Sequence, residues 1–174
     1  MWRSAFFALA FFFPFIGTAQ KTIEKALERF NKGTVPYITV DELKEHTDFV
    51  LLDTRKKEEF EVSHLQNAVW VGYKKFDIGR IQSEIPNHST PVIVYCSIGV
   101  RSEQIGEKLQ KAGYTNVKNL YGGIFQWKDE GNVVVDSTNQ TTERIHAFSK
   151  QWGKLLTNGD KVYSLKKESI EKQR

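Results

Sequence analysis

The 174-residue chain contains a single cysteine, Cys96, and this scarcity limits its chemistry at once. One cysteine cannot form a disulfide within the chain, so disulfides do not hold the fold together. Histidines are also few, and His46, His88 and His146 lie far apart without the spacing of metal ligands. The sequence therefore predicts no metal site.

Strong charge of one sign is also missing. The formal net charge is only +4, and no stripe of Arg and Lys interleaved with aromatic residues indicates a nucleic-acid surface. Hydrophobic residues make up 40% of the chain and charged residues 26%, which is typical of a soluble globular protein with a substantial core. No internal repeat is present, so the length predicts one domain of ordinary size with additional segments.

One long apolar run lies near the start of the chain. Arg3 precedes an uncharged apolar stretch at 5–16, and the small residues Gly17, Thr18 and Ala19 follow it. This pattern is typical of a secretory signal peptide at 1–19, cleaved near Ala19. A membrane anchor is the alternative, but a helix needs about 20 apolar residues to span a bilayer. We therefore expect an exported bacterial protein, periplasmic or secreted, without stable membrane insertion after cleavage.

Strand and helix patterns alternate with short connections after a helical lead-in at 20–34. We expect strands at 37–39, 49–53, 68–71, 92–96 and 117–120, and helices at 22–30, 41–45, 56–62, 76–85, 102–112 and 122–127, with Asp41 capping the second helix. Such alternation predicts an α/β fold with a parallel sheet covered by helices on both faces. Asp53 and Cys96 both fall at carboxyl ends of strands, where ligands bind in such sheets.

The segment 131–174 lies outside this alternation. Apolar residues recur there at spacings of three and four, which predicts an amphipathic helix followed by a charged tail: Ile145, Phe148, Trp152, Leu155 and Leu156. We expect this helix to dock on the domain's own surface. The alternative is a helix that binds a protein partner.

Cys96 ends an apolar run, 91–95, that reads as a buried strand, and a helix pattern follows it. A thiol at a helix N-terminus lies where backbone N–H groups and the helix dipole favour the thiolate. The alternative is a buried, inert cysteine. The loop that follows favours a reactive sulfur: Ser97 is small, Gly99 allows the chain to curve, and Arg101 supplies a positive charge. Successive N–H groups in such an arc can hold an anion.

These residues resemble a known family. The segment 96–102, with sequence CSIGVRS, is similar to the active-site loop of rhodanese-like sulfurtransferases. The resemblance extends to 51–55, to 58–60, to 64–68 and to the stretch from Gly113 to Trp127. It covers about residues 35–130 and rests on several motifs in the same order, which makes it specific.

The resemblance implies a rhodanese-like fold with a five-stranded parallel sheet. It also implies that the Cys96 thiolate takes sulfane sulfur from thiosulfate or a persulfide as a cysteine persulfide, and passes it to cyanide or a thiol. The implied binding loop is Ser97, Ile98, Gly99, Val100, Arg101 and Ser102. No cofactor is implied beyond the covalent persulfide. More thiosulfate-adapted members carry basic residues within this loop, whereas positions 97, 98 and 100 here are Ser, Ile and Val.

Two other functions stay open. A rhodanese-like domain without activity could bind a partner through the C-terminal helix, although Cys96 and Arg101 are both present. Related phosphatases and arsenate reductases are disfavoured, because the phosphatases carry one more residue in the loop. Here four residues separate Cys96 from Arg101.

Three further residues resemble the supporting positions of the family. Asp53 and Arg55 match its Asp-x-Arg motif, and we expect them to form an ion pair that fixes the strand end rather than contact substrate. Glu59 is expected in the same network. His64 could serve as a general base, but the family position organises the chain before the next strand, and a preformed thiolate needs no base.

Overall fold

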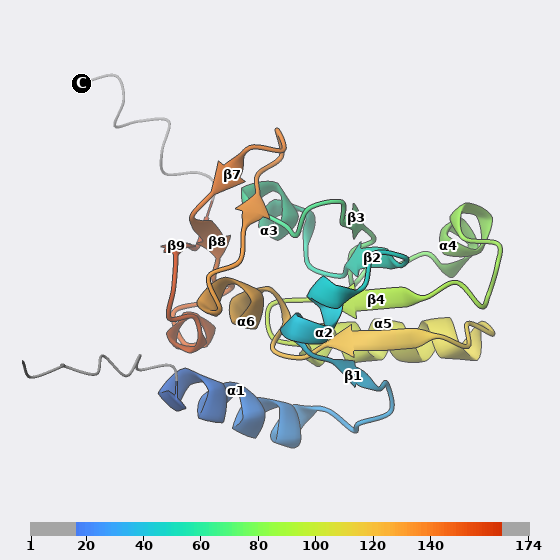
Figure 1. Cartoon of the computed structure of the whole chain (residues 1–174), viewed down its shortest axis with the longest axis horizontal. Helices are drawn as coiled ribbons and strands as arrows, with labels where there is room; N and C mark the ends of the chain where they lie inside the picture. The colour runs from blue at the N-terminus through green and yellow to red at the C-terminus, as the bar shows by residue number, and fades with distance from the viewer. Residues whose placement is uncertain (1–16, 165–174) are drawn as a thin grey trace, which may run out of the picture.

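The computed structural model describes residues 17–164, with side chains from residue 22 onward. At its centre is a five-stranded sheet in the order β1-β5-β4-β2-β3, with every neighbouring pair parallel (Figure 1). The strands are β1 (Tyr37–Ile38), β2 (Val50–Asp53), β3 (Val69–Trp70), β4 (Val92–Tyr95) and β5 (Val117–Leu120). The predicted α/β fold with a five-stranded parallel sheet is confirmed.

Helices cover both faces of the sheet. They are α1 (Gly17–Phe30), α2 (Val40–Glu45), α3 (Lys57–Val62), α4 (Ile78–Glu84), α5 (Val100–Lys111) and α6 (Gly123–Asp129). Leu27 of α1 and Phe125 of α6 belong to the apolar core on one face, whereas Ile81 of α4 and Leu109 of α5 belong to the core on the other. Because both faces are covered, all four residues of β4 are buried.

The register of the sheet brings the ends of two strands together. Asp53 is the last residue of β2 and pairs with Tyr95, the last residue of β4. Cys96 follows directly, so Asp53 and Cys96 leave the sheet at the same carboxyl edge, as expected.

The start of α2 differs from the prediction. Asp41 lies inside the helix, and the N-cap is Thr39, whose side chain accepts a hydrogen bond from the backbone N–H of Glu42. The Glu42 carboxylate in turn accepts from the Thr39 backbone N–H at 2.8 Å. This reciprocal capping box satisfies two backbone donors, which a lone acidic residue in the first turn does not.

The predicted C-terminal amphipathic helix is wrong. The segment instead forms β6 (Val134–Val135), β7 (Thr141–Thr142), β8 (Arg144–His146), the 3₁₀ turn η1 (Trp152–Leu155) and β9 (Asp160–Val162). β6 pairs with β7 and β8 pairs with β9. Phe148 has a left-handed backbone with φ of +61°, which no helix can continue through. Local spacing missed this because the partner of β8 lies beyond η1 in the sequence.

The segment nevertheless docks on the domain, which was the expected placement. Ile145, Leu155 and Leu156 are buried in the same core as α1 and α6. The Asp129 carboxylate at the end of α6 accepts the backbone N–H groups of Thr157 and Asn158, each at 2.7 Å. The segment is therefore fastened at several points.

Within residues 17–164, no helix combines the length and hydrophobicity needed to cross a membrane. The predicted signal peptide lies outside the described residues except for its last three, which begin α1, and the end of the predicted charged tail, 165–174, also lies outside them.

Candidate active site

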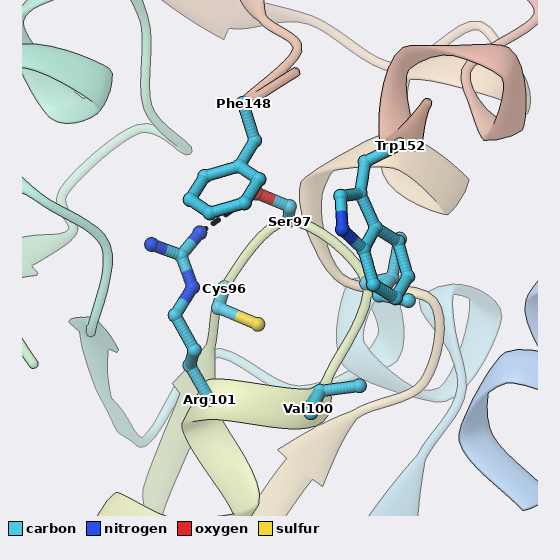
Figure 2. A pocket seen from close by; sticks show the side chains of 7 residues that line it. Cys96, Ser97, Val100, Arg101, Phe148 and Trp152 are labelled. Atoms are coloured by element: carbon cyan, nitrogen blue, oxygen red, sulfur yellow. Dashed lines mark hydrogen bonds between the residues drawn. The ribbon is translucent and has the colours of Figure 1, made fainter. Parts of the chain in front are cut away.

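Cys96 stands between the central strand β4 and the start of α5, and only 1% of the residue is exposed. Figure 2 shows its Sγ pointing into the arc of the loop that joins the two elements. The N-cap of α5 is Gly99, with φ of +112°. A side chain there would be strained and would also meet Leu27 of α1 at 3.3 Å, so the turn requires glycine.

Two asparagines fix the shape of this loop. The side-chain amides of Asn119 and Asn31 donate to the Gly99 carbonyl at 2.8 and 3.0 Å. The Ser102 hydroxyl donates to the Asn119 amide oxygen at 2.7 Å. The sequence reasoning did not identify Asn31 or Asn119, because each lies far from the loop in the chain and neither belongs to a recognisable motif.

The loop also rests on the start of α6. The backbone N–H of Ile124 donates to the Cys96 carbonyl at 3.0 Å, and that of Phe125 donates to the Ser97 carbonyl at 3.1 Å. A Cβ on Gly123 would lie 2.3 Å from the Cys96 carbonyl oxygen, so this position also requires glycine. The Gly122–Gly123 pair thus has a definite structural role.

The surroundings of Cys96 favour its thiolate. The Gly99 backbone N–H donates to Sγ at 3.2 Å. Burial raises the pKa of the Cys96 thiol, but the positive charge of Arg101 and hydrogen bonds from Ser102 and Gly99 outweigh it, so the pKa lies below its ordinary value. A thiolate is the nucleophilic form of cysteine, which makes Cys96 the candidate nucleophile of the site.

Arg101 and Glu59 form a bidentate ion pair beside the thiol. The two terminal nitrogens of the guanidinium donate to the two carboxylate oxygens at 2.7 and 2.8 Å, and one also donates to the Ser97 hydroxyl at 2.9 Å. Glu59 thus hydrogen-bonds with Arg101 rather than with Arg55, although the charge of Arg55 also acts on it. Burial raises the pKa of Glu59, but the hydrogen bonds and charge of Arg101 and the charge of Arg55 lower it by more. The pKa of Glu59 therefore lies below its ordinary value.

Asp53 and Arg55 form the expected ion pair at the end of β2, and both side chains are fully buried. The guanidinium also donates to the Ser63 carbonyl at 2.7 Å, while the Trp70 indole N–H donates to the Arg55 carbonyl at 2.9 Å. Neither Asp53 nor Arg55 lines the cavity described below. Their contacts join β2 to the chain around α3 and β3.

His64 also lies away from the cavity. Its ring stacks on Phe60 with centroids 3.8 Å apart, and Nδ1 lies 3.0 Å from the Phe60 carbonyl oxygen. Burial lowers its pKa. These contacts organise the chain after α3, in agreement with the non-catalytic interpretation.

A cavity of about 180 Å³ opens above the thiol. Of the predicted loop, Gly99 and Ser102 do not line the cavity. The Ser102 hydroxyl donates to Asn119 instead, and the Gly99 backbone N–H donates to Sγ. The walls of the cavity are Cys96, Ser97, Ile98, Val100, Arg101, Phe148 and Trp152 (Figure 2).

Two of these walls come from the C-terminal segment. The Phe148 ring centroid lies 4.9 Å from Cζ of Arg101, and Trp152 packs against Phe30 of α1 at 5.7 Å between ring centroids. The sequence placed Phe148 and Trp152 on a helix and gave no signal that they face Cys96. Within residues 17–164, no cluster of three potential metal ligands is present.

Comparisons with known proteins agree with this geometry. A family model described as "Rhodanese-like domain" matches residues 39–130, just over half of the chain. The thiosulfate sulfurtransferase GlpE of Coxiella burnetii is 30% identical over 94 residues, which is 54% of this chain and 85% of that protein. The adenylyltransferase and sulfurtransferase UBA4 of Candida albicans is 34% identical over 88 residues, 47% of this chain but only a fifth of that protein.

Solved structures show the same fold. A thiosulfate sulfurtransferase from Pseudomonas aeruginosa superposes with a TM-score of 0.55 at 23% identity, covering 79% of this chain and 26% of that chain. The rhodanese-like domain of the Alr3790 protein from Anabaena gives a TM-score of 0.53 at 24% identity, covering 58% of this chain and 79% of that chain. At these identities the likeness concerns the fold.

Proposed function

Because the chain belongs to the rhodanese-like family, we propose that it is a sulfurtransferase that carries sulfane sulfur as a persulfide on Cys96. The donor is thiosulfate or a persulfide, and the acceptor is a thiol or, in an assay, cyanide. The observation that supports this best is the buried Cys96 Sγ, which accepts the Gly99 N–H at 3.2 Å, has a lowered pKa and borders a cavity.

The reaction has two displacement steps. In the first, Sγ of the Cys96 thiolate attacks the outer sulfur of thiosulfate, the S–S bond of the donor breaks, and its electron pair leaves with sulfite. In the second, the acceptor attacks the outer sulfur of the persulfide and the thiolate is regenerated. When cyanide is the acceptor, the product released is thiocyanate. Each step conserves charge and needs no oxidant, metal or organic cofactor.

The loop is suited to hold the persulfide anion. An added sulfur extends from Sγ into the arc of the loop, where the start of α5 presents its backbone N–H groups. Arg101 contributes a positive charge at the edge of this arc and lowers the pKa of Cys96. Asp53 and Arg55 act at a distance, by holding the end of β2 next to β4.

The non-catalytic alternative has a specific difficulty. A domain that only bound a partner would not need a thiol with a lowered pKa at the floor of a cavity. The partner-binding helix of that alternative is also not formed, because 144–162 folds as two strands and a 3₁₀ turn. The phosphatase alternative requires a wider loop than the four residues between Cys96 and Arg101.

Intact mass measurement tests the proposal. The purified protein is incubated with thiosulfate and separately with glutathione persulfide, then treated with cyanide. We expect a gain of one sulfur atom that cyanide removes, and no gain for Cys96→Ser. A protein that gains no sulfur from either donor, while remaining folded, would contradict the persulfide mechanism.

A further inference from the structure

The two aromatic walls of the cavity come from outside the matched domain. The family match ends at residue 130, whereas Phe148 and Trp152 belong to the segment that follows it. This segment is anchored to α6 by the Asp129 contacts and by buried Leu155 and Leu156. Its aromatic side chains therefore stand at fixed positions above Cys96.

Phe148 is held in a conformation that needs compensation. Its φ of +61° is uncommon for a residue other than glycine, and such outliers persist where the surrounding structure enforces them. The Phe148 backbone N–H donates to Nδ1 of His146 at 3.2 Å, and the ring lies beside the guanidinium of Arg101. Phe148 remains 42% exposed, so burial alone does not explain its position at the cavity wall.

The side chains that line the cavity offer a small dianion no unpaired positive charge. Arg101 is the only cationic side chain among the lining residues, and both of its terminal nitrogens already donate to Glu59. The pair is neutral, and Phe148 lies against the guanidinium. An incoming sulfonate group would have to displace Glu59 or rely on backbone N–H groups alone.

The size and chemistry of the walls favour an apolar group instead. Four of the lining residues are apolar, and they are Ile98, Val100, Phe148 and Trp152. Figure 2 shows Val100, Phe148 and Trp152 around the space next to Sγ. An apolar cavity of about 150 Å³ is known to hold benzene, and the volume here is about 180 Å³. The space therefore suits one ring or a short alkyl chain attached to the sulfur that reacts.

On the basis of the proposed sulfurtransferase function, the geometry points to Phe148 and Trp152 as specificity-determining residues that select an organic sulfane-sulfur donor whose carrier group is apolar and about the size of one aromatic ring. With an aryl thiosulfonate, the Cys96 thiolate attacks the outer sulfur, the S–S bond breaks, and the aryl sulfinate leaves with the electron pair. The aryl ring lies between the two aromatic walls while the thiosulfonate sulfur faces Sγ.

The test compares kcat/KM for benzenethiosulfonate and thiosulfate, with cyanide as acceptor, in the wild type and in Phe148→Ala and Trp152→Ala. We expect the wild type to prefer benzenethiosulfonate and each variant to lower that preference by about fivefold, within the range of one aromatic contact. The ratio of the two kcat/KM values is the readout, because a change in the reactivity of Cys96 itself affects both donors alike. Phe49→Ala, a partly buried aromatic at the opposite edge of the sheet, is the matched control.

A second measurement depends neither on turnover nor on whether Trp152→Ala folds. Cys96→Ser protein should bind benzenesulfinate in calorimetry, and binding should weaken when Phe148→Ala, at an exposed residue, is added. If the wild type forms the persulfide but shows the same donor preference in all variants, the selection by Phe148 and Trp152 is refuted and the sulfurtransferase proposal stands. If no donor loads Cys96, the proposed function itself fails.

Discussion

Two arginine–carboxylate ion pairs lie near each other in this molecule, Asp53–Arg55 and Glu59–Arg101, and they differ in burial and in what surrounds them. Asp53 and Arg55 are both fully buried, and the guanidinium also contacts the Ser63 carbonyl and the Tyr95 ring. Glu59 is also fully buried, but 17% of the Arg101 side chain is exposed and it lines the cavity with Cys96. The same kind of ion pair is thus buried within the fold in one place and lies at the wall of the candidate active site in the other.

The comparison shows how burial separates structural from functional charge. A charge that cannot reach water needs its partner at all times, because the uncompensated ion would be very costly. A charge at the wall of a cavity keeps some solvent access and can influence a neighbouring thiol. Removing one partner from each pair should therefore have unequal consequences for stability and for the reactivity of Cys96.

The largest expected effect is that of Asp53→Asn. It leaves the Arg55 guanidinium buried without a counter-charge, and we expect the free energy of unfolding to fall by about 3–5 kcal/mol. Urea denaturation followed by circular dichroism measures this. Asp41→Asn, which alters an exposed carboxylate 3.9 Å from Lys44, should change stability by less than about 0.5 kcal/mol. A small effect of Asp53→Asn would contradict a structural role for the buried pair.

Glu59→Gln should cost less than Asp53→Asn, because water can reach part of Arg101 once its partner is neutral. We expect a loss of about 2–3 kcal/mol by the same denaturation measurement. If Glu59→Gln were the more costly substitution, the ranking of the two pairs by exposure would be wrong.

The pH dependence of stability separates Glu59 from other carboxylates. Its folded pKa is lowered, so its stabilising contribution is complete above the unfolded value of about 4.3 and is lost as pH falls through the folded pKa. The wild type should therefore lose part of its stability on acidification below about pH 4. The difference in unfolding free energy between the wild type and Glu59→Gln should shrink over that range.

Arg101→Gln tests the influence of the Arg101–Glu59 pair on the thiol. It removes the positive charge that lowers the pKa of Cys96 and leaves the Glu59 carboxylate nearby, so the pKa of the thiol should rise. The rate of alkylation by iodoacetamide against pH measures it, and the midpoint should move to higher pH. Arg80→Gln, in an exposed pair with Glu84, should leave the midpoint unchanged. An unchanged midpoint in Arg101→Gln would mean that the charge of Arg101 does not lower the pKa of the thiol.

The features that could be predicted from the sequence are those that depend on residues close together in the chain. The alternation of strands and helices predicted the parallel sheet, and the residues flanking Cys96 predicted a loop that favours a thiolate. The ion pair between Asp53 and Arg55 was predicted from the resemblance, because the two residues match the family's Asp-x-Arg motif.

The parts that were missed depend on contacts between distant segments. Glu59 and Arg101 lie on different helices, so the sequence alone did not pair them. Asn31 and Asn119 meet at Gly99 only after folding. Phe148 and Trp152 have helical spacing, but strand pairing and a left-handed residue override that pattern.

The smallest expected effect belongs to Ser97→Ala, which removes a hydroxyl that contacts both Arg101 and Glu59 and leaves the ion pair itself. The Ser97 hydroxyl accepts from Arg101 at 2.9 Å, but the guanidinium keeps both of its bonds to Glu59. We expect a stability loss of about 1 kcal/mol and a shift of the Cys96 alkylation midpoint smaller than that in Arg101→Gln. Ser97→Thr keeps the hydroxyl and is the matched variant. A shift as large as that of Arg101→Gln would mean that the hydroxyl, rather than the charge of the arginine, controls the thiol.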